Sequence, residues 1–458
     1  MRKFIPFVLV LTFLPLLIHA QHEDRKIQIR AFYDQTLSNR QSYQWLEDLC
    51  SLGPRLSGSE GSLRAIEWMK GVMDTCGFDR VYLQPVKVPH WERGIPEKAE
   101  ILDSRGLRYD LNVLAIGGSV ATPEGGILAS VVEVPSLMAL EDLEREEVEG
   151  KIVFFNSIFD QTNISPGASY GAVVASRAEG AIRAARKGAV ASIIRSVSSG
   201  FDDVPHTGSG HYEASTDSIP AAALGVQSAD LLHQILLRDP LAKVYLSMHC
   251  RWHPDTESFN VIAEITGNER PDQIIVMGGH LDSWDVGVGA HDDGAGCMHT
   301  LGALKLLLDQ GVRPKHTVRA VMFMNEENGL RGGITYAEQA ISNGEEHIVA
   351  IESDAGGYSP RGFGVSGNAS QMEKLESWVG LFPRNTISYI SRGGGGADIG
   401  PLNRADGTPM IGLIVDGQKM FDLHHSANDV FEAVHPRELE LGTASIATLV
   451  YLIDQYGL

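Results

Sequence analysis

The chain has 458 residues, of which 43% are hydrophobic and 21% are charged, and its formal net charge is −20. This composition is ordinary for a globular protein of two or three domains, and it excludes a disordered, collagen-like or polytopic membrane protein. A surface this acidic repels phosphate backbones, so the sequence argues against nucleic acid as a partner.

The first 20 residues are typical of a secretory signal peptide. Arg2 and Lys3 form a basic start, residues 4–18 are apolar, and Ala20 offers a small residue for cleavage. The apolar run is short for a membrane span. We therefore predict a signal peptide over 1–20 and a mature chain that is secreted or periplasmic. No later stretch predicts a stable membrane span.

Three zones follow the signal peptide, and the first two differ in their patterns. Residues 21–115 begin with helical patterns, such as the spacing of Leu46 and Leu49, and continue with short strand-like runs. Residues 116–255 have a different pattern, with strands expected at 127–132, 151–155 and 189–194 and an alanine-rich helix expected at 172–187. This second zone predicts an inserted mixed α/β module.

Residues 256–458 alternate predicted strands and helices. We expect strands at 260–265, 274–278, 318–324, 348–352 and 410–415, and helices at 294–309, 331–342, 370–379 and 437–455. The strands are continuous apolar runs, which is typical of strands covered on both faces. The pattern predicts an α/β fold with a three-layer, mainly parallel sheet, which places ligands at the carboxyl ends of its strands.

Histidines and carboxylates gather after these predicted strands. They occur in five segments, at residues 279–282, 289–296, 325–329, 353–357 and 423–429. One carboxylate after a strand is usually a helix cap, but five segments at one sheet edge predict a shared metal site. Two imidazoles and three carboxylates without a thiolate favour Zn²⁺. Five ligands fit two ions that share one carboxylate.

These segments resemble the motifs of the co-catalytic zinc exopeptidases, the family that includes bacterial leucyl aminopeptidases and glutamate carboxypeptidases. The metal-site motifs span residues 278–429, and residues 88–94, 195–196 and 205–208 are similar to one subgroup of the family. That subgroup carries a protease-associated domain as an insertion. The resemblance therefore implies that 116–255 is this domain, between the two parts of a catalytic domain at 21–115 and 256–458.

The resemblance also assigns roles to the site residues. It implies that two zinc ions per chain are bound by His280, Asp292, Glu327, Asp354 and His425. Asp292 is expected to bridge the ions, with Asp293 as a helix N-cap, although these two roles could be exchanged. Asp282 is expected to orient His280 through its ring N–H, with a cap or turn residue as the alternative. Glu326 is expected to be the general base.

Two assignments keep alternatives open. Either His424 or His425 can be the last ligand, and His425 is favoured because the family's ligand precedes Ser or Thr and lies four residues before an acidic residue. Substrate contacts are expected from His424 and from a loop that borders the substrate in the family, at Asp398, Gly395 and Gly396. The glycines would let backbone approach a ligand closely. Asp398 would bind a free α-amino group or cap the following turn.

The predicted function is hydrolysis of dipeptides or short peptides by a metal-held water, with Glu326 as general base. A glutaminyl cyclase-type enzyme and a non-catalytic, receptor-like relative are the alternatives. The intact ligand set and the inserted module favour the peptidase. The motifs do not distinguish amino- from carboxy-terminal cleavage, and a homodimer is implied by the resemblance alone.

Overall fold

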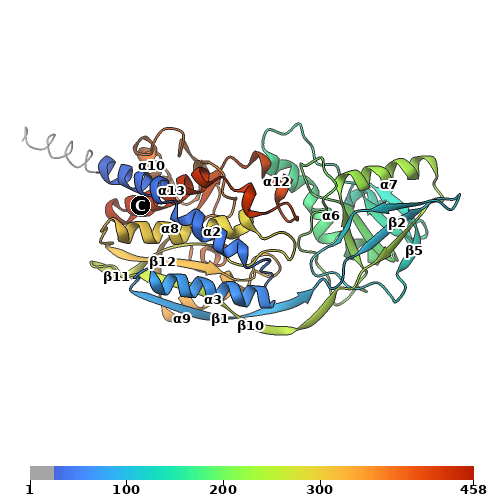
Figure 1. Cartoon of the computed structure of the whole chain (residues 1–458), viewed down its shortest axis with the longest axis horizontal. Helices are drawn as coiled ribbons and strands as arrows, with labels where there is room; N and C mark the ends of the chain where they lie inside the picture. Colours follow the sequence, from blue (N-terminus) through green and yellow to red (C-terminus); the bar gives the residue numbers. More distant parts are fainter. Residues whose placement is uncertain (1–24) are drawn as a thin grey trace, which may run out of the picture.

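The computed structural model describes residues 25–458, so the predicted signal peptide lies outside the described residues. Two eight-stranded sheets lie toward opposite ends of an elongated molecule (Figure 1). Among the residues described, no helix combines the length and apolar character needed to cross a membrane.

The first sheet has the strand order β1-β10-β12-β11-β13-β16-β14-β15. Its strands are β1 (Arg80–Glu92), β10 (Arg251–Ile265), β11 (Arg270–His280), β12 (His316–Phe323), β13 (Glu346–Glu352), β14 (Pro360–Ser366), β15 (Tyr389–Arg392) and β16 (Met410–Val415). The four central strands, β12, β11, β13 and β16, are parallel. β10 and β14 run antiparallel to these central strands. The mainly parallel sheet predicted from sequence is confirmed.

Helices cover both faces of this sheet. One face packs against a helix at 25–39 and against α2 (Gln41–Ser51), α3 (Glu60–Thr75), α8 (Ala295–Asp309), α10 (Ala369–Trp378) and α13 (Pro436–Tyr456). The other face packs against α9 (Arg331–Asn343) and α11 (Gly400–Asp406). In β12, Ala320 and Met322 join the first core while Val321 and Phe323 join the second. Side chains alternate along a strand, so the continuous apolar run fills both cores.

The second sheet has the order β3-β2-β9-β5-β6-β7-β8-β4 and its own cores. Its strands are β2 (Lys98–Leu102), β3 (Arg108–Leu111), β4 (Val113–Ala115), β5 (Ile127–Val134), β6 (Ile152–Phe155), β7 (Ala191–Arg195), β8 (Ala221–Leu224) and β9 (Lys243–Ser247). Its helices are α4 (Leu137–Glu141), α5 (Arg145–Val148), α6 (Pro166–Arg186) and α7 (Val226–Arg238). We call residues 93–250 the inserted module.

The module begins earlier than the sequence boundary between 115 and 116. Strands β2, β3 and β4 all precede that boundary, yet they belong to the second sheet. The reason is a long-range pairing, because β2 pairs with β9 in an antiparallel ladder. A short strand whose partner lies far along the chain leaves no local signal of the sheet that it joins.

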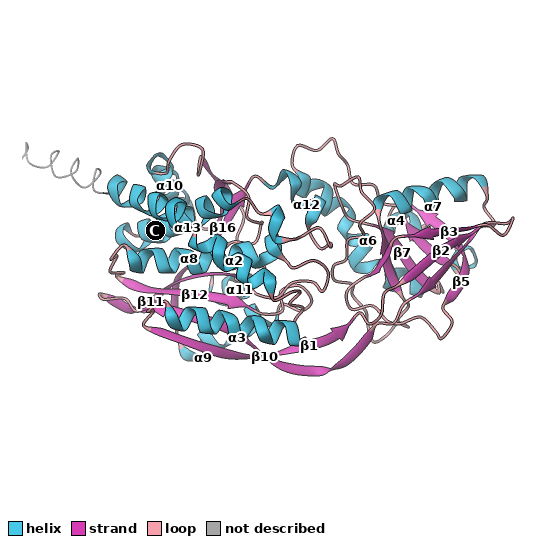
Figure 2. Cartoon of the chain, in the orientation of Figure 1, coloured by secondary structure: helices cyan, strands magenta, loops and turns pink. Residues whose placement is uncertain are grey.

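A two-stranded ribbon connects the module with the first sheet (Figure 2). β1 and β10 pair antiparallel along their length, and the last pair is Glu92 with Arg251. The ribbon is fastened to the module by two indoles: Trp91 Nε1 donates to Ser119 O at 2.8 Å, and Trp252 Nε1 donates to Gly118 O at 3.0 Å. The chain therefore enters and leaves the module at neighbouring points.

Candidate active site

The five predicted ligands lie together beyond the carboxyl ends of the central strands. His280 ends β11, Glu327 follows β12 and Asp354 follows β13. Asp292 precedes α8, and His425 follows the short helix α12 (Met420–Leu423). Parallel strands end at one edge of the sheet, which is why segments far apart in sequence converge here.

Asp292 lies between the two histidines. Its Oδ1 is 3.1 Å from His280 Nε2, and its Oδ2 is 3.2 Å from His425 Nε2. Asp354 Oδ1 lies 3.6 Å from His280 Nε2, and Glu327 Oε2 lies 3.1 Å from His425 Nε2. Two groups of donors therefore share one carboxylate, which is the arrangement that a pair of metal ions requires.

Asp293 has a different environment from its neighbour Asp292. Its Oδ1 accepts the backbone N–H of Gly296 at 3.0 Å, in the first turn of α8, and its Oδ2 accepts the N–H of His280 at 3.1 Å. Both oxygens are thus used within the protein. This geometry favours Asp292 over Asp293 as the bridging ligand.

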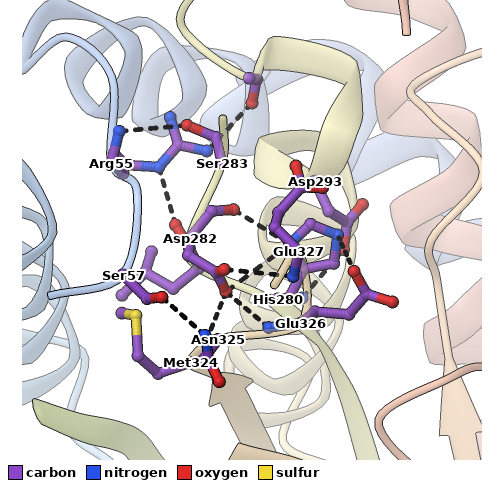
Figure 3. Close-up of polar contacts among 12 residues, drawn as sticks. Arg55, Ser57, His280, Asp282, Ser283, Asp293, Met324, Asn325, Glu326 and Glu327 are labelled. Carbon is purple, nitrogen blue, oxygen red and sulfur yellow. Dashed lines mark hydrogen bonds and ion pairs between the residues drawn. The ribbon is translucent and has the colours of Figure 1, made fainter. Parts of the chain in front are cut away.

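Asp282 contacts the His280 ring through its backbone and not through its carboxylate. The ring nitrogen His280 Nδ1 lies 2.9 Å from the backbone oxygen of Asp282, whereas the nearest carboxylate oxygen is 3.9 Å away. The carboxylate instead accepts backbone N–H groups of Asn325 at 2.6 Å, Glu326 at 3.1 Å and Glu327 at 3.3 Å (Figure 3). Asp282 therefore orients His280 with its carbonyl and fixes the loop after β12 with its side chain.

Glu326 is placed to exchange protons at the metal site. Its Oε2 lies 4.0 Å from His280 Nε2, and its side chain is 22% exposed. Burial raises the pKa of Glu326 well above its usual range, and the neighbouring Asp354 adds to the rise. A bound cation would offset this effect, leaving a carboxylate that can take a proton and return it.

The two adjacent histidines after α12 are not equivalent. His425 Nε2 contacts both Asp292 and Glu327, whereas His424 Nε2 reaches only Asp292, at 3.7 Å. The His424 ring stacks on the His425 ring with centroids 3.5 Å apart, and it meets Tyr170 edge-on. The geometry favours His425 as the ligand and His424 as its packing support at the cavity wall.

The module holds the backbone of both histidines. His206 Nδ1 donates to His424 O at 2.7 Å, and Thr207 N–H donates to His425 O at 2.9 Å. Burial lowers the pKa of His206 to about 4, so its ring is neutral at pH 7 and keeps one N–H to donate. The ligand loop is thus set by residues of both sheets.

Three supporting residues were not predicted from sequence. Arg55 is fully buried and donates to Leu281 O at 2.8 Å, to Gly289 O at 3.0 Å and to the carbonyl of Val288. Asp429 accepts the backbone N–H groups of His291 at 2.7 Å and Asp292 at 3.0 Å. Glu352 accepts the N–H of Ile399 at 2.9 Å. In the sequence, Asp429 served only as the acidic residue four positions after His425 that favoured His425 as the ligand. An isolated Arg or Glu carries no local signal of such a role.

The glycine-rich loop lies differently from the expectation. Gly396 faces Glu352, where a Cβ would lie 1.9 Å from the carboxyl carbon, and Gly395 faces Met410 in the same way at 2.9 Å. These glycines allow close approach to the protein's own side chains, and neither lines the large cavity at the site. Asp398 is buried, and within residues 25–458 its carboxylate has no hydrogen-bond partner, so it does not cap the next turn.

A cavity of about 720 Å³ opens onto the metal-ligand cluster. The first sheet contributes Glu326, Asp354 and His424 to its lining, and the start of α6 in the module contributes Tyr170 and Arg177. Arg177 is buried and donates to Tyr170 Oη at 2.8 Å, and among the described residues its Nε has no hydrogen-bond partner. The lining of the cavity therefore combines carboxylates with a buried cation, and Arg177 Nη1 lies 3.3 Å from His425 Nδ1.

The donor set fits a pair of divalent cations. Although burial lowers the pKa of His425, Glu327 and Asp292 raise it to about 10. Burial and Asp292 raise the pKa of Glu327 to about 7. The cluster thus takes up protons to balance its negative charge, and metal ions would supply the same positive charge. Imidazole and carboxylate donors suit borderline ions such as Zn²⁺.

Comparison with known proteins gives consistent relatives. The sequence profile of Peptidase family M28 matches residues 260–450. Carboxypeptidase Q of Bos taurus is 38% identical, and that of Homo sapiens 36% identical, each over 91% of this chain and 86% of the relative. The crystal structure of a Peptidase M28 precursor from Shewanella amazonensis matches with a TM-score of 0.90 and 34% identity, covering 95% of this chain and 98% of that chain.

The fold, the ligand constellation and these relatives together define a metallo-exopeptidase. The likeness extends over nearly the whole chain and well beyond the ligand motifs. The chain belongs to peptidase family M28. The predicted membership of an exopeptidase family is confirmed, as is the likeness to one subgroup, which is that of carboxypeptidase Q.

Proposed function

We propose that the protein is a secreted or periplasmic zinc exopeptidase that hydrolyses dipeptides or short peptides. The observation that carries the proposal is the position of Asp292 between His280 and His425, with Glu326 beside them at the cavity. The protease-associated character of the module and a homodimeric assembly are further parts of the proposal. Secretion rests on the signal peptide predicted over 1–20.

Two zinc ions per chain complete the proposed site. His280, Asp354 and Asp292 would hold one, and His425, Glu327 and Asp292 the other. The ions would supply a water of lowered pKa and a positive field for the oxyanion formed when water attacks the scissile carbonyl. Asp282, Arg55 and Asp429 keep the ligand loops in place through backbone hydrogen bonds.

Glu326 carries the proton in the proposed reaction. Its carboxylate takes a proton from the attacking water and delivers it to the nitrogen of the leaving amine. Because Asp282 binds the N–H of Glu326, the base stays directed at the same position through both transfers. The protein itself forms no covalent bond with the substrate.

Short peptides are favoured by the walls of the cavity. Its volume of about 720 Å³ suits a small ligand, and residues of the module form part of its lining. Arg177 offers a buried cation to a free carboxylate. Asp398 does not line this cavity, and its unpaired carboxyl group remains the proposed acceptor for a free α-amino group. The relatives named carboxypeptidase Q support exopeptidase action, and the complete ligand set disfavours the cyclase and receptor alternatives.

The proposal is tested by replacing Glu326 with Gln. We expect kcat for a dipeptide panel to fall by about 10²–10⁴-fold, while metal content by elemental analysis stays at two zinc ions. The variant Glu338→Gln, at an exposed position of α9, is the matched control and should retain activity. Chelation should abolish turnover, and added zinc should restore it.

Three results would count against the proposal. Two bound metals without turnover of any peptide would favour the cyclase or receptor alternatives, and a glutamine-terminated peptide in the panel separates these two. Full activity in Glu326→Gln would refute the assignment of Glu326 as the general base. Absence of bound metal in the active wild type would overturn the ligand assignment.

A further inference from the structure

One motif of the subgroup, residues 88–94, is not used by the catalytic site. It lies on β1 at the end of the ribbon, where His90 and Glu92 are two residues apart. Side chains at this spacing point to the same face of a strand. The residue between them, Trp91, points the other way and is buried against the module. The motif therefore presents an imidazole and a carboxylate away from the module.

The strand register adds a second imidazole to this face. His90 is paired directly with His253 of β10, next to a register shift between Val88 and His90. The two rings stack with centroids 4.5 Å apart. Glu92 Oε2 lies 3.1 Å from His253 Nε2, and Glu92 Oε1 lies 3.4 Å from His90 Nε2. One ligand atom of each residue lies within 4.8 Å of the others.

No neighbouring cation competes for this carboxylate. Arg251 is the cross-strand partner of Glu92, yet in the described part of the chain the ion pairs of Glu92 are both with histidines. The side chains are 24% exposed for His90, 53% for Glu92 and 37% for His253. The ion pairs of these three side chains are therefore with one another, and among the described residues the buried His253 Nε2 has no hydrogen-bond partner.

We propose that His90, Glu92 and His253 bind a divalent transition-metal ion, Zn²⁺, at a second site separate from the catalytic cluster. Two imidazoles and one carboxylate leave a coordination position open to water, as in three-ligand zinc sites. The donors come from two paired strands, so the ladder holds them near one another before the ion binds. None of the three lines the catalytic cavity.

The position of this site suggests what the ion does. The ribbon is the covalent connection between the two sheets, and its far face is fastened to the module by Trp91 and Trp252. Just beyond Glu92, Arg93 forms an ion pair with Asp285 of the first sheet. An ion on the outer face cross-links β1 and β10 at this junction and stabilises the join between module and sheet.

The test is a zinc titration of the purified mature protein with its catalytic ions in place. Calorimetry and elemental analysis should show one more zinc equivalent in the wild type than in His253→Ala or His90→Ala. The control His249→Ala, an exposed histidine two residues before β10, should retain it. Added zinc should raise the Tm of the wild type and not that of the two variants. Dipeptide hydrolysis at basal zinc should be unchanged.

Further variants and a copper titration distinguish the ribbon site from the proposed catalytic site. The milder variant Glu92→Gln should weaken the extra equivalent even if a histidine variant folds poorly. Cu²⁺ added to the zinc-loaded protein should give an electron paramagnetic resonance spectrum of copper bound by two nitrogen atoms. Both histidine variants should lose this spectrum. His425→Ala should lower catalytic zinc and leave the extra equivalent in place. Equal stoichiometry in wild type, His90→Ala, His253→Ala and Glu92→Gln overturns the ribbon site, whatever the peptidase assay shows.

Discussion

Asp282 shows how one buried charge organises the active site. Its carboxylate is fully buried and accepts three consecutive backbone N–H groups, from Asn325 to Glu327. Hydrogen bonds to a charged group contribute about 1.5–3 kcal/mol each, so this contact fixes both the proposed base, Glu326, and one proposed ligand, Glu327. The same residue turns the ring of His280 through its carbonyl oxygen.

We expect Asp282→Asn to damage both stability and turnover. An amide has only one acceptor oxygen, so at least one of the three N–H groups loses its partner. The free energy of unfolding should fall by about 2–4 kcal/mol, and kcat should fall by at least about tenfold as Glu326 shifts. Urea unfolding and dipeptide assays check this. The control Asp272→Asn, at an exposed position of β11, should change neither stability nor turnover. Equal behaviour of the two variants would refute the organising role of Asp282.

The proposed ligands His280, Glu327 and Asp354 could be named from sequence because they end or follow the apolar strands β11, β12 and β13. Asp282 was expected to orient His280 through its ring N–H, and it does so with its backbone oxygen, because the turn after β11 directs its side chain toward the next loop. Arg55, Asp429 and Glu352 were missed because their partners are backbone atoms brought close only by tertiary folding. A side chain that acts through backbone groups leaves no motif.

At the scale of elements, a module loop supports a loop of the first sheet. His206 and Thr207 bind the carbonyls of His424 and His425, and Ser199 Oγ donates to Asp422 at 2.6 Å. The final ligand thus depends on a segment more than 200 residues earlier. This gives residues 205–208, which include no predicted ligand, a supporting role at the site.

His206→Leu should weaken metal binding without unfolding the protein. It removes the donor to the His424 carbonyl, so the ligand loop loses a restraint and zinc affinity should fall on the order of tenfold. A chelator titration followed by zinc content and activity measures this change. His211→Ala, an exposed residue of the same segment, is the control. An unchanged chelator midpoint in His206→Leu would contradict the supporting role.

A buried histidine between elements predicts acid sensitivity. His347 of β13 lies 2.7 Å from the hydroxyl of Tyr336 in α9, and burial together with Arg319 lowers its pKa to about 4. The folded state therefore favours the neutral ring. Its contribution to stability is full above pH 6.5 and is lost as pH falls toward 4, by about 2 kcal/mol at pH 5.

His347→Gln should flatten this pH dependence. Glutamine can still bond Tyr336 but does not titrate, so the difference in unfolding free energy between pH 7 and pH 5 should shrink by about 2 kcal/mol. Urea unfolding at both pH values, with metal-free protein, gives the comparison. The exposed His435→Gln should keep the wild-type slope. An identical slope in His347→Gln would show that the His347 ring takes up its proton alike in the folded and unfolded states, which contradicts the lowered pKa.

The elements that sequence analysis missed have weak local patterns. β16 was expected at 410–415 and lies there, whereas β14 was not expected because Pro360, Gly362 and Gly364 interrupt its apolar pattern. β14 forms because β16 and β15 pair with both of its edges. Tertiary pairing thus replaces local propensity at this side of the sheet.

At the scale of the whole molecule, the module is both a separate fold and part of the active site. It has its own sheet and cores, yet it forms one wall of the cavity and holds the last ligand. The module was expected to begin at residue 116, after β2, β3 and β4, because these strands have no local pattern that distinguishes them from other short strands. Only their pairing assigns them to the module.

Deleting the module should leave a folded but inactive protein. Because Glu92 and Arg251 are a cross-strand pair, an Asn-Gly turn can replace residues 93–250 and close β1 and β10 as a hairpin, with Trp91 and Trp252 changed to Thr. Circular dichroism should show cooperative unfolding. We expect kcat/KM to fall by at least about 10²-fold, since the ligand loop loses its restraints. Activity within tenfold of wild type would contradict a catalytic role for the module.

The same ribbon imposes a delay on the growing chain. β1 is an edge strand whose neighbour in the sheet is β10, and about 160 residues separate them. At about 5–20 residues per second of synthesis, β1 waits on the order of 10 s for its partner. The module can complete its own sheet during this wait. Folding of the module brings its own two ends together. It thereby shortens the loop that must be closed when β1 pairs with β10.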